Sequence, residues 1–355
     1  MSSSSSSVVV ERLGACVVSI TLNRPKKLNA LDPIMIGELT AAVEAVRRGI
    51  VVMRGEGKAF CAGGDVAGVR AANLKNNAPD EGMSFFRNEY SLNALLGRLG
   101  QPSSPVKQVS LWDGIVMGGG AGLSVHGRFR VATERSVFAM PETAIGFFPD
   151  VGASYVLSRM PKRTGFYAAL TGARLRPADL VYSGLATHYV QRDRLDALID
   201  DLKLCEEGEE EDNTKLDAAV QGVLDAASSP PPDASGLEQH ADAIDLCFSQ
   251  PTVDAILARL RSSSSSSSSV FEAETAETLA AMSPTSLAIT LESLRRAEHA
   301  TLDEVLATDL RLAARLVDPT ITPLPDFFEG VRAVLVDKDR NPQWHAPDAR
   351  FPSVK

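Results

Sequence analysis

Two glycine-rich turns carry residues of this sequence that could stabilise a negative charge. Glycines 118–120 follow one apolar run, and FCAGGD places Gly63 and Gly64 after another. Glycine lets a backbone approach a ligand closely, and the first N–H groups of a helix have no intrahelical acceptor. Either turn alone is also typical of a simple tight turn. Because there are two of them, we expect their N–H groups to converge on one oxygen.

Two carboxylates stand in a setting that would be poorly solvated. Glu142 and Asp150 lie eight residues apart in PETAIGFFPD, among apolar residues and two prolines. Desolvation raises the pKa of a carboxyl group, which suits it to proton transfer. The alternative is that each residue only caps a turn.

Cysteine and histidine are weaker candidates for chemistry. Cys61 lies in a glycine-rich loop, but nothing in the sequence places a base such as His126 within its reach, so packing is the expected role. His188 has no second ligand at helical spacing and is expected to be a packed or surface residue. The four cysteines show neither metal-ligand spacing nor a disulfide framework, which indicates a reducing compartment.

Composition bounds the class of protein and its partners. The 355 residues carry a net charge of −9, and no apolar run approaches the roughly 20 residues that span a bilayer. The start, MSSSSSSVVVERLG, has neither the pattern of a secretory signal nor that of an Arg-rich presequence. We therefore expect a globular protein with no membrane partner and no broad nucleic-acid surface, although Arg24, Lys26 and Lys27 could hold a phosphorylated small molecule.

The periodicity predicts an α/β fold. Asp32 is placed to cap a helix that opens with Pro33. The expected strands are 15–23, 49–55, 106–112 and 129–132, and the expected helices are 33–48, 85–99 and a short one after glycines 118–120. The stretch 152–190 is expected to be helical cover for the sheet, and helical patterns dominate from Leu237 onward.

Three regions follow from shifts in composition. Residues 8–203 form the expected core with the glycine turns and carboxylates, 204–236 an acidic and Pro/Ser-rich connection, and 237–355 a helical region. Within the connection, Glu206–Asp212 is expected to be solvated and Ser228–Ser235 to be a linker. The serine runs at Ser2–Ser7 and Ser262–Ser269 have the composition of disordered linkers.

Several pieces together resemble the crotonase (enoyl-CoA hydratase/isomerase) superfamily. They include ITLNRPKKLNAL, GKAFCAGGDV, FFRNEYSLN, GIVMGGGAGLSVHGRFRVATE and FAMPETAIGFFPDVGASYVL. With the late EGVRAVLVDKDRNPQWHAP they are most similar to the 3-hydroxyisobutyryl-CoA hydrolase branch. The resemblance implies a spiral of repeated strand–strand–helix units with a helical C-terminal region. It also implies an acyl-CoA substrate, with coenzyme A as part of that substrate and no separate cofactor or metal.

The resemblance also implies roles for individual residues. The backbone N–H groups of Gly64 and Gly119 would form an oxyanion hole, and Glu142 and Asp150 would be the catalytic carboxylates. Glu142 would either activate a water or attack the thioester itself, and Asp150 would hold the 3-hydroxyl of the substrate or the water.

Four further residues would bind the substrate by the same resemblance. Glu89 would contact it as a further acid, and Arg24, Lys26 and Lys27 would face the phosphates of coenzyme A. The expected reaction is hydrolysis of a 3-hydroxyacyl-CoA, 3-hydroxyisobutyryl-CoA giving 3-hydroxyisobutyrate and coenzyme A as in valine catabolism.

Two other functions are compatible with such a chain. The first is an enoyl-CoA hydratase or isomerase, but Gly122 stands where typical hydratases carry a second catalytic glutamate. The second is a non-catalytic subunit of a mitochondrial ribosome, which would bring contact with nucleic acid; the glycine turns and both carboxylates favour catalysis instead. A homo-oligomer is compatible with the resemblance. We expect a location in the mitochondrial matrix for a eukaryotic protein and in the cytoplasm for a bacterial one.

Overall fold

The chain forms two compact units, each assembled from separate stretches of sequence. The computed structural model describes residues 6–205, 213–262 and 269–345. The first unit comprises Met1–Gly64, Ser91–Phe138 and Leu175–Ser235, and the second comprises Asp65–Tyr90, Ala139–Arg174 and Gly236–Lys355. The run Glu206–Asp212 and most of both serine runs lie outside the described residues.

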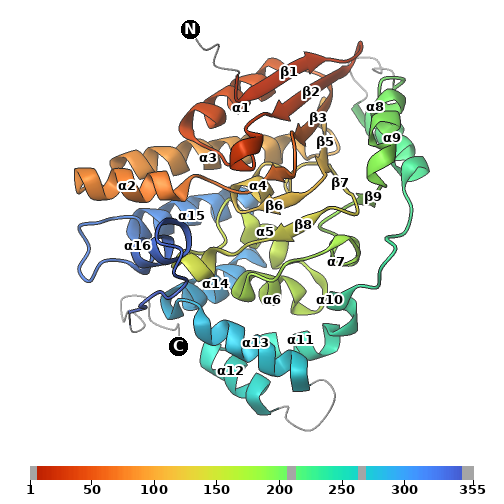
Figure 1. Cartoon of the computed structure of the whole chain (residues 1–355). Helices are drawn as coiled ribbons and strands as arrows, with labels where there is room; N and C mark the ends of the chain where they lie inside the picture. The colour runs from red at the N-terminus through yellow and green to blue at the C-terminus, as the bar shows by residue number, and fades with distance from the viewer. Residues whose placement is uncertain (1–5, 206–212, 263–268, 346–355) are drawn as a thin grey trace. The chain divides into compact units, whose positions relative to one another are not determined.

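A six-stranded sheet forms the centre of the first unit (Figure 1). β1 pairs antiparallel with β2, and every later neighbouring pair is parallel. In sheet order the strands are β1 (Val8–Arg12), β2 (Val17–Leu22), β3 (Gly49–Gly55), β5 (Val106–Trp112), β7 (Phe129–Ala132) and β9 (His188–Tyr189).

A second, three-stranded sheet is interleaved with the first along the sequence. Its order is β4 (Ala59–Cys61), β6 (Ile115–Met117) and β8 (Val137–Ala139). Each of these strands directly follows one of the large sheet, and a helix follows each pair of strands. The predicted α/β class and the strand–strand–helix repeat are confirmed.

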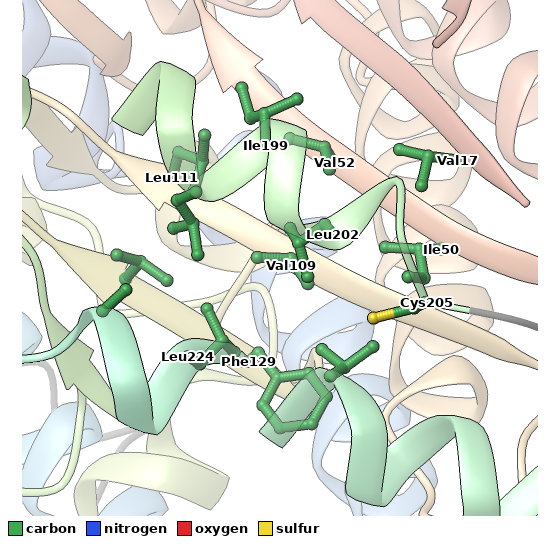
Figure 2. Close-up of a cluster of buried hydrophobic side chains, with 14 of the residues drawn as sticks. Val17, Ile50, Val52, Val109, Leu111, Phe129, Ile199, Leu202, Cys205 and Leu224 are labelled. Carbon is green, nitrogen blue, oxygen red and sulfur yellow. The ribbon is translucent and has the colours of Figure 1, made fainter. Parts of the chain in front are cut away.

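Helices cover one face of the large sheet in the first unit. α8 (Leu195–Leu202) and α9 (Asn213–Ala227) contribute Leu202 and Leu224 to one buried cluster with side chains of the strands (Figure 2). The strands supply alternate positions such as Val109 and Leu111 because successive strand residues face opposite sides. Each buried aliphatic side chain stabilises the fold by about 1.5–3 kcal/mol relative to exposure.

The first long helix begins where the sequence predicts. α1 (Pro33–Ala45) has proline at its first position, and the carboxylate of Asp32 accepts a hydrogen bond from the amide of Met35 at 2.9 Å. The remaining helical segments of this unit are η1 (Pro25–Lys27), α4 (Gly119–Gly122), α7 (Pro177–Tyr182) and η4 (Arg192–Arg194), and α3 (Asp80–Leu99) begins in the second unit and ends in the first.

The second unit is built almost wholly from helices. From Gly236 onward the described residues form helices and their connections, which confirms the predicted helical C-terminal region. Its segments are α2 (Val66–Asn76), η2 (Glu142–Ile145), α5 (Ala153–Leu157), η3 (Pro161–Arg163), α6 (Thr164–Thr171), α10 (Gly236–Gln239), α11 (Ala241–Phe248), α12 (Val253–Ser262), α13 (Ser269–Ala281), α14 (Pro284–Ala297), α15 (Leu302–Leu316), α16 (Asp326–Val331) and the π-helical turn η5 (Arg332–Val336). No described helix has the length and apolarity to cross a membrane.

The structure differs from the sequence expectations mainly at short elements. Residues 188–189 form β9 rather than helix, because they pair with Val131 and Ala132 of β7. The helix expected from residue 33 ends at Ala45, and the helix expected from residue 85 begins at Asp80. Residues 228–235 contain neither helix nor strand. The division into three regions at residues 203 and 236 stays a prediction.

Candidate active site

In the first unit, the two glycine turns lie at the ends of neighbouring strands. β4 and β6 pair in parallel, so the turns that follow them leave the same edge of the small sheet. A side-chain carbon added to Gly63 would lie 3.4 Å from the carbonyl oxygen of Met117 and 3.8 Å from the amide nitrogen of Gly119. The φ of Gly63 is +110°, which side chains rarely allow. The turn before Gly64 therefore sits against the turn that begins at Gly119.

Among the described residues, the backbone hydrogen bonds at these turns are donated by residues other than Gly64 and Gly119. The amides of Ala121 and Gly122 donate to the oxygen of Gly118, and the amide of Leu31 donates to the oxygen of Gly63. Gly119 is the first residue of α4, where an amide has no intrahelical acceptor. The convergence of the Gly64 and Gly119 amides on one oxygen remains a prediction that this arrangement supports.

The packing under the turns explains Cys61. Its side chain is fully buried, and a carbon added to Gly120 would lie 2.2 Å from the Cys61 carbonyl oxygen. Only glycine allows α4 to approach β4 so closely. Cys61 thus packs beneath the loop, as expected from the sequence. His188 is likewise buried in β9, with Asp225 at 3.2 Å from its Nε2.

The cations expected to face phosphate groups lie at η1 of the same unit. Lys26 and Lys27 are exposed. Arg24 instead pairs with Asp32 at 2.9 Å and donates to the carbonyl oxygen of Ala30 at 2.5 Å. Because Arg24 is already engaged within the protein, the two lysines are the better candidates for an outside anion.

In the second unit, Glu142 is the first of a group of buried carboxyls. It opens η2 after Pro141 and is 7% exposed. Its Oε2 is buried without a hydrogen-bond partner among the described residues. Burial, and then the charge of Asp150, raise the pKa of Glu142 well above its ordinary value. A buried carboxyl with an unused oxygen is suited to meet a ligand.

Asp150 lies close enough to Glu142 for their charges to interact. The hydroxyl of Tyr90 donates to its Oδ2 at 2.6 Å. Burial raises the pKa of Asp150 to about 7, although the Tyr90 hydrogen bond acts in the opposite direction. Asp150 can therefore exchange a proton near neutral pH.

Glu89 is a third carboxyl in the same neighbourhood. It directly precedes Tyr90 in α3, is almost fully buried, and has an Oε1 without a partner among the described residues. Burial, and then the charge of Asp150, raise the pKa of Glu89 well above its ordinary value. The structure thus brings together the three acids predicted from the sequence: Glu89, Glu142 and Asp150.

Asp309 is a fourth carboxyl, which the sequence reasoning missed. It lies in α15, is 1% exposed, and its Oδ2 accepts a hydrogen bond from the Gly152 amide at 2.9 Å. Burial is the main cause that raises the pKa of Asp309 well above its ordinary value, and the charge of Asp150 adds to it. The sequence does carry a signal for its burial. Asp309 lies at helical spacing from the apolar residues Val305, Leu306 and Ala313, which share its face of the helix and are buried.

Aromatic side chains from the segments that carry these acids pack on one another. Phe86 stacks on Phe147 with ring centroids 5.4 Å apart, and Phe147 also contacts Phe148 and Phe327. Rings exclude water and so oppose ionisation of the carboxyls. No Lys or Arg contributes to the pKa shifts of the four acids within the described chain. Burial without a compensating cation therefore favours the protonated forms of these carboxyls.

Comparison with known proteins identifies the family. The sequence model described as enoyl-CoA hydratase/isomerase matches residues 17–351. The chain belongs to this family. The family resemblance expected from the sequence is thus confirmed.

Individual members of the family narrow the comparison. The chain is 43% identical over 352 residues to the mitochondrial 3-hydroxyisobutyryl-CoA hydrolase of Rattus norvegicus, covering 97% of this chain and 85% of that one. It is 42% identical over 346 residues to the probable 3-hydroxyisobutyryl-CoA hydrolase 3 of Arabidopsis thaliana, covering 96% and 87%. A solved structure titled carnitinyl-CoA dehydratase, from Mycobacterium thermoresistibile, matches with a TM-score of 0.82 and 34% identity over 98% of this chain and 96% of that one. The crotonase-type fold is confirmed.

The raised pKa of Asp150 makes a prediction about stability. The folded pKa of about 7 exceeds the unfolded value near 4, so the folded protein binds more protons between these pH values. The contribution of Asp150 is thus most favourable at low pH and is lost as the pH rises through about 7. Asp150→Asn carries no charge at any pH. We expect its free energy of unfolding, relative to that of the wild type, to be a few kcal/mol higher at about pH 8 than at about pH 5.

Denaturant unfolding of both proteins at the two pH values measures this difference. Asp217→Asn is the matched control, because Asp217 is ion-paired with Arg128 at 2.9 Å. Its loss should lower stability at both pH values alike. A stability difference between Asp150→Asn and wild type that does not change with pH would contradict the raised pKa.

Proposed function

We propose that this protein hydrolyses 3-hydroxyisobutyryl-CoA to 3-hydroxyisobutyrate and coenzyme A. The observation that carries the proposal is the pair Glu142 and Asp150, two interacting buried carboxyls, of which the first has an unpaired buried oxygen. The rat and Arabidopsis relatives bear the name of this hydrolase, and this chain matches them over most of their length. An acid pair with raised pKa values suits hydrolysis near neutral pH.

The first chemical requirement is stabilisation of the carbonyl oxygen. When an oxygen nucleophile attacks the thioester carbon, the electron pair of the C=O bond moves to oxygen. We assign the amides of Gly64 and Gly119 to that negative charge. Removing one such donor in another enzyme costs about 2.7–4 kcal/mol of barrier, so two preorganised donors account for a substantial part of the acceleration.

Glu142 supplies or activates the oxygen nucleophile. In one route its carboxylate takes a proton from water as the water oxygen bonds to the thioester carbon. In the other, a Glu142 oxygen bonds to that carbon, and water then cleaves the mixed anhydride. In both, the C–S bond breaks and the thiolate of coenzyme A leaves and takes up a proton.

Either route requires Glu142 without its proton. Burial favours the protonated form of Glu142 in the free protein. Asp150, with a pKa of about 7, is the neighbour that can accept this proton. We therefore assign Asp150 two tasks: it shares the proton of Glu142 and accepts a hydrogen bond from the 3-hydroxyl of the substrate. The second task would discriminate hydroxylated from plain acyl chains.

Hydration of an enoyl-CoA is the second candidate, because the matching solved structure is titled a dehydratase. Gly122 weighs against it. It is buried in α4 and has no side chain, so this position cannot supply the second glutamate typical of hydratases. Hydrolysis needs only one nucleophile or base beside the oxyanion donors.

Substrate binding and location complete the proposal. Glu89 would contact the acyl part, and Lys26 and Lys27, with Arg24 behind them, would bind phosphate groups of coenzyme A. Since the hydrolases of rat and several other eukaryotes are named mitochondrial, we propose the mitochondrial matrix if this chain is eukaryotic. In a bacterium the reaction would be cytoplasmic.

The proposal predicts which reaction occurs and which residue it needs. Thiol release from 3-hydroxyisobutyryl-CoA should be rapid, and water addition to crotonyl-CoA should be slow. Glu142→Gln should lower kcat for thiol release by about 10²-fold or more, because an amide neither accepts the proton nor forms an anhydride. Glu277→Gln, at an exposed position of α13, is the matched control and should retain wild-type kcat.

Two results would contradict this proposal. A folded Glu142→Gln protein with near wild-type thiol release would remove Glu142 from the reaction. Faster hydration of crotonyl-CoA than hydrolysis by the wild type would favour the hydratase instead.

The lysines of η1 make a separate prediction about binding. Reversal of both charges, Lys26→Glu with Lys27→Glu, should raise KM for the acyl-CoA by about tenfold and leave kcat nearly unchanged, because the phosphates lie far from the reacting carbon. Lys75→Glu, another exposed lysine, is the control and should leave both constants unchanged. An unaltered KM in the double variant would exclude the two lysines from the site.

A further inference from the structure

Asp309 is a buried acid for which the proposed reaction has no use. It belongs to α15, far along the sequence from Glu142 and Asp150, and is 1% exposed. Its described hydrogen bond is to the backbone amide of Gly152, at 2.9 Å from Oδ2. Burying a carboxyl costs desolvation free energy, and here the hydrogen bond to the Gly152 amide offsets part of it. The same bond fixes the backbone at Gly152.

The Gly152 amide belongs to a strained turn directly after Asp150. Val151 has a φ of +53°, and Gly152 a φ of +74°. A β-branched side chain in the left-handed region is a backbone outlier and carries strain. Val151 is also fully buried, so the turn cannot relax by moving its side chain into solvent. Such a conformation persists only where neighbouring groups hold it.

Two elements hold Asp150 from different directions. From α3, the Tyr90 hydroxyl fixes the side chain through Oδ2 at 2.6 Å. From α15, Asp309 fixes the backbone two residues later. Within the turn, the Ala153 amide donates a short-range hydrogen bond to the Asp150 carbonyl oxygen, at 2.8 Å. The Asp309 contact is thus a long-range tie on the backbone that aims Asp150.

We propose that Asp309 is a positioning residue: by accepting the Gly152 N–H it holds the strained turn in the form that presents Asp150 to the substrate's 3-hydroxyl. Asp309 thereby determines how strongly the protein prefers hydroxylated acyl chains. The inference rests on the proposed hydrolysis and on the role given there to Asp150. Asparagine at this position keeps the accepting oxygen, whereas alanine removes it.

The test compares two substrates that differ in the hydroxyl alone. For the full chain, kcat/KM is measured with 3-hydroxyisobutyryl-CoA and with isobutyryl-CoA, and their ratio is the readout. Asp309→Ala should lower the ratio by about tenfold, mainly through the hydroxylated substrate, since a misplaced acceptor no longer discriminates. Asp309→Asn should retain the ratio within about threefold, because the Gly152 amide keeps its acceptor.

Asp217→Ala separates positioning from general destabilisation. Asp217 is a buried carboxyl of the first unit that pairs with Arg128 and with the buried Lys107. Its loss should lower the melting temperature while the ratio stays at the wild-type value, because both substrates depend equally on the folded fraction. If Asp309→Ala does not fold, Asp309→Ser, whose hydroxyl is too short to reach the amide, is measured in its place.

The outcomes distinguish this inference from the proposed function. A wild type without preference for the hydroxylated substrate would contradict the assigned role of Asp150, and the inference with it. A wild type with that preference and a folded Asp309→Ala or Asp309→Ser protein with an unchanged ratio would overturn the inference alone. A ratio in Asp309→Asn as low as that in Asp309→Ala would also overturn it, because the accepting oxygen would then not account for the preference.

Discussion

Burial of several carboxyl groups together is the constraint on which the chemistry of this protein depends. Each would ionise readily in water, but Glu89, Glu142, Asp150 and Asp309 are buried in the protein. Burial raises the pKa of all four, and the charge of Asp150 further raises the pKa values of the other three. Removing a charged group from water costs more free energy than removing a neutral one, so burial favours the protonated carboxyls. A carboxyl whose pKa lies near neutral pH can both donate and accept a proton there.

Each of the two units holds one group of the candidate residues. In the first unit the glycine turns follow parallel strands, and only glycine allows the backbones to approach so closely there. The second unit holds the buried carboxyls, and aromatic rings of the segments that carry them pack together. The strain at Val151 fits this division, since strained backbone is typical of sites where a side chain must be aimed.

Much of this arrangement could be predicted from the sequence because the signals are local. The glycine turns, the helix cap at Asp32 and the apolar setting of Glu142 and Asp150 are each visible within a dozen residues. In the small sheet, β4 and β6 were visible only as the apolar runs before the glycine turns, and β8 was missed, because three residues are too few to show an alternating pattern. Tyr90 and Asp309 were missed for another reason: their partners lie far away in sequence, and an aspartate on a helix is usually solvated. The roles of Gly64 and Gly119 came from family resemblance, since a backbone N–H leaves no mark in side-chain chemistry.

Infrared spectroscopy measures whether the buried acids retain their protons. With isotope-labelled side-chain carboxyl carbons in the full chain, protonated and ionised carboxyls absorb separately. We expect a protonated-carboxyl signal that persists at neutral pH, with a component that titrates near 7 and is absent from Asp150→Asn. A spectrum in which every carboxyl of the wild type is ionised at neutral pH would contradict it.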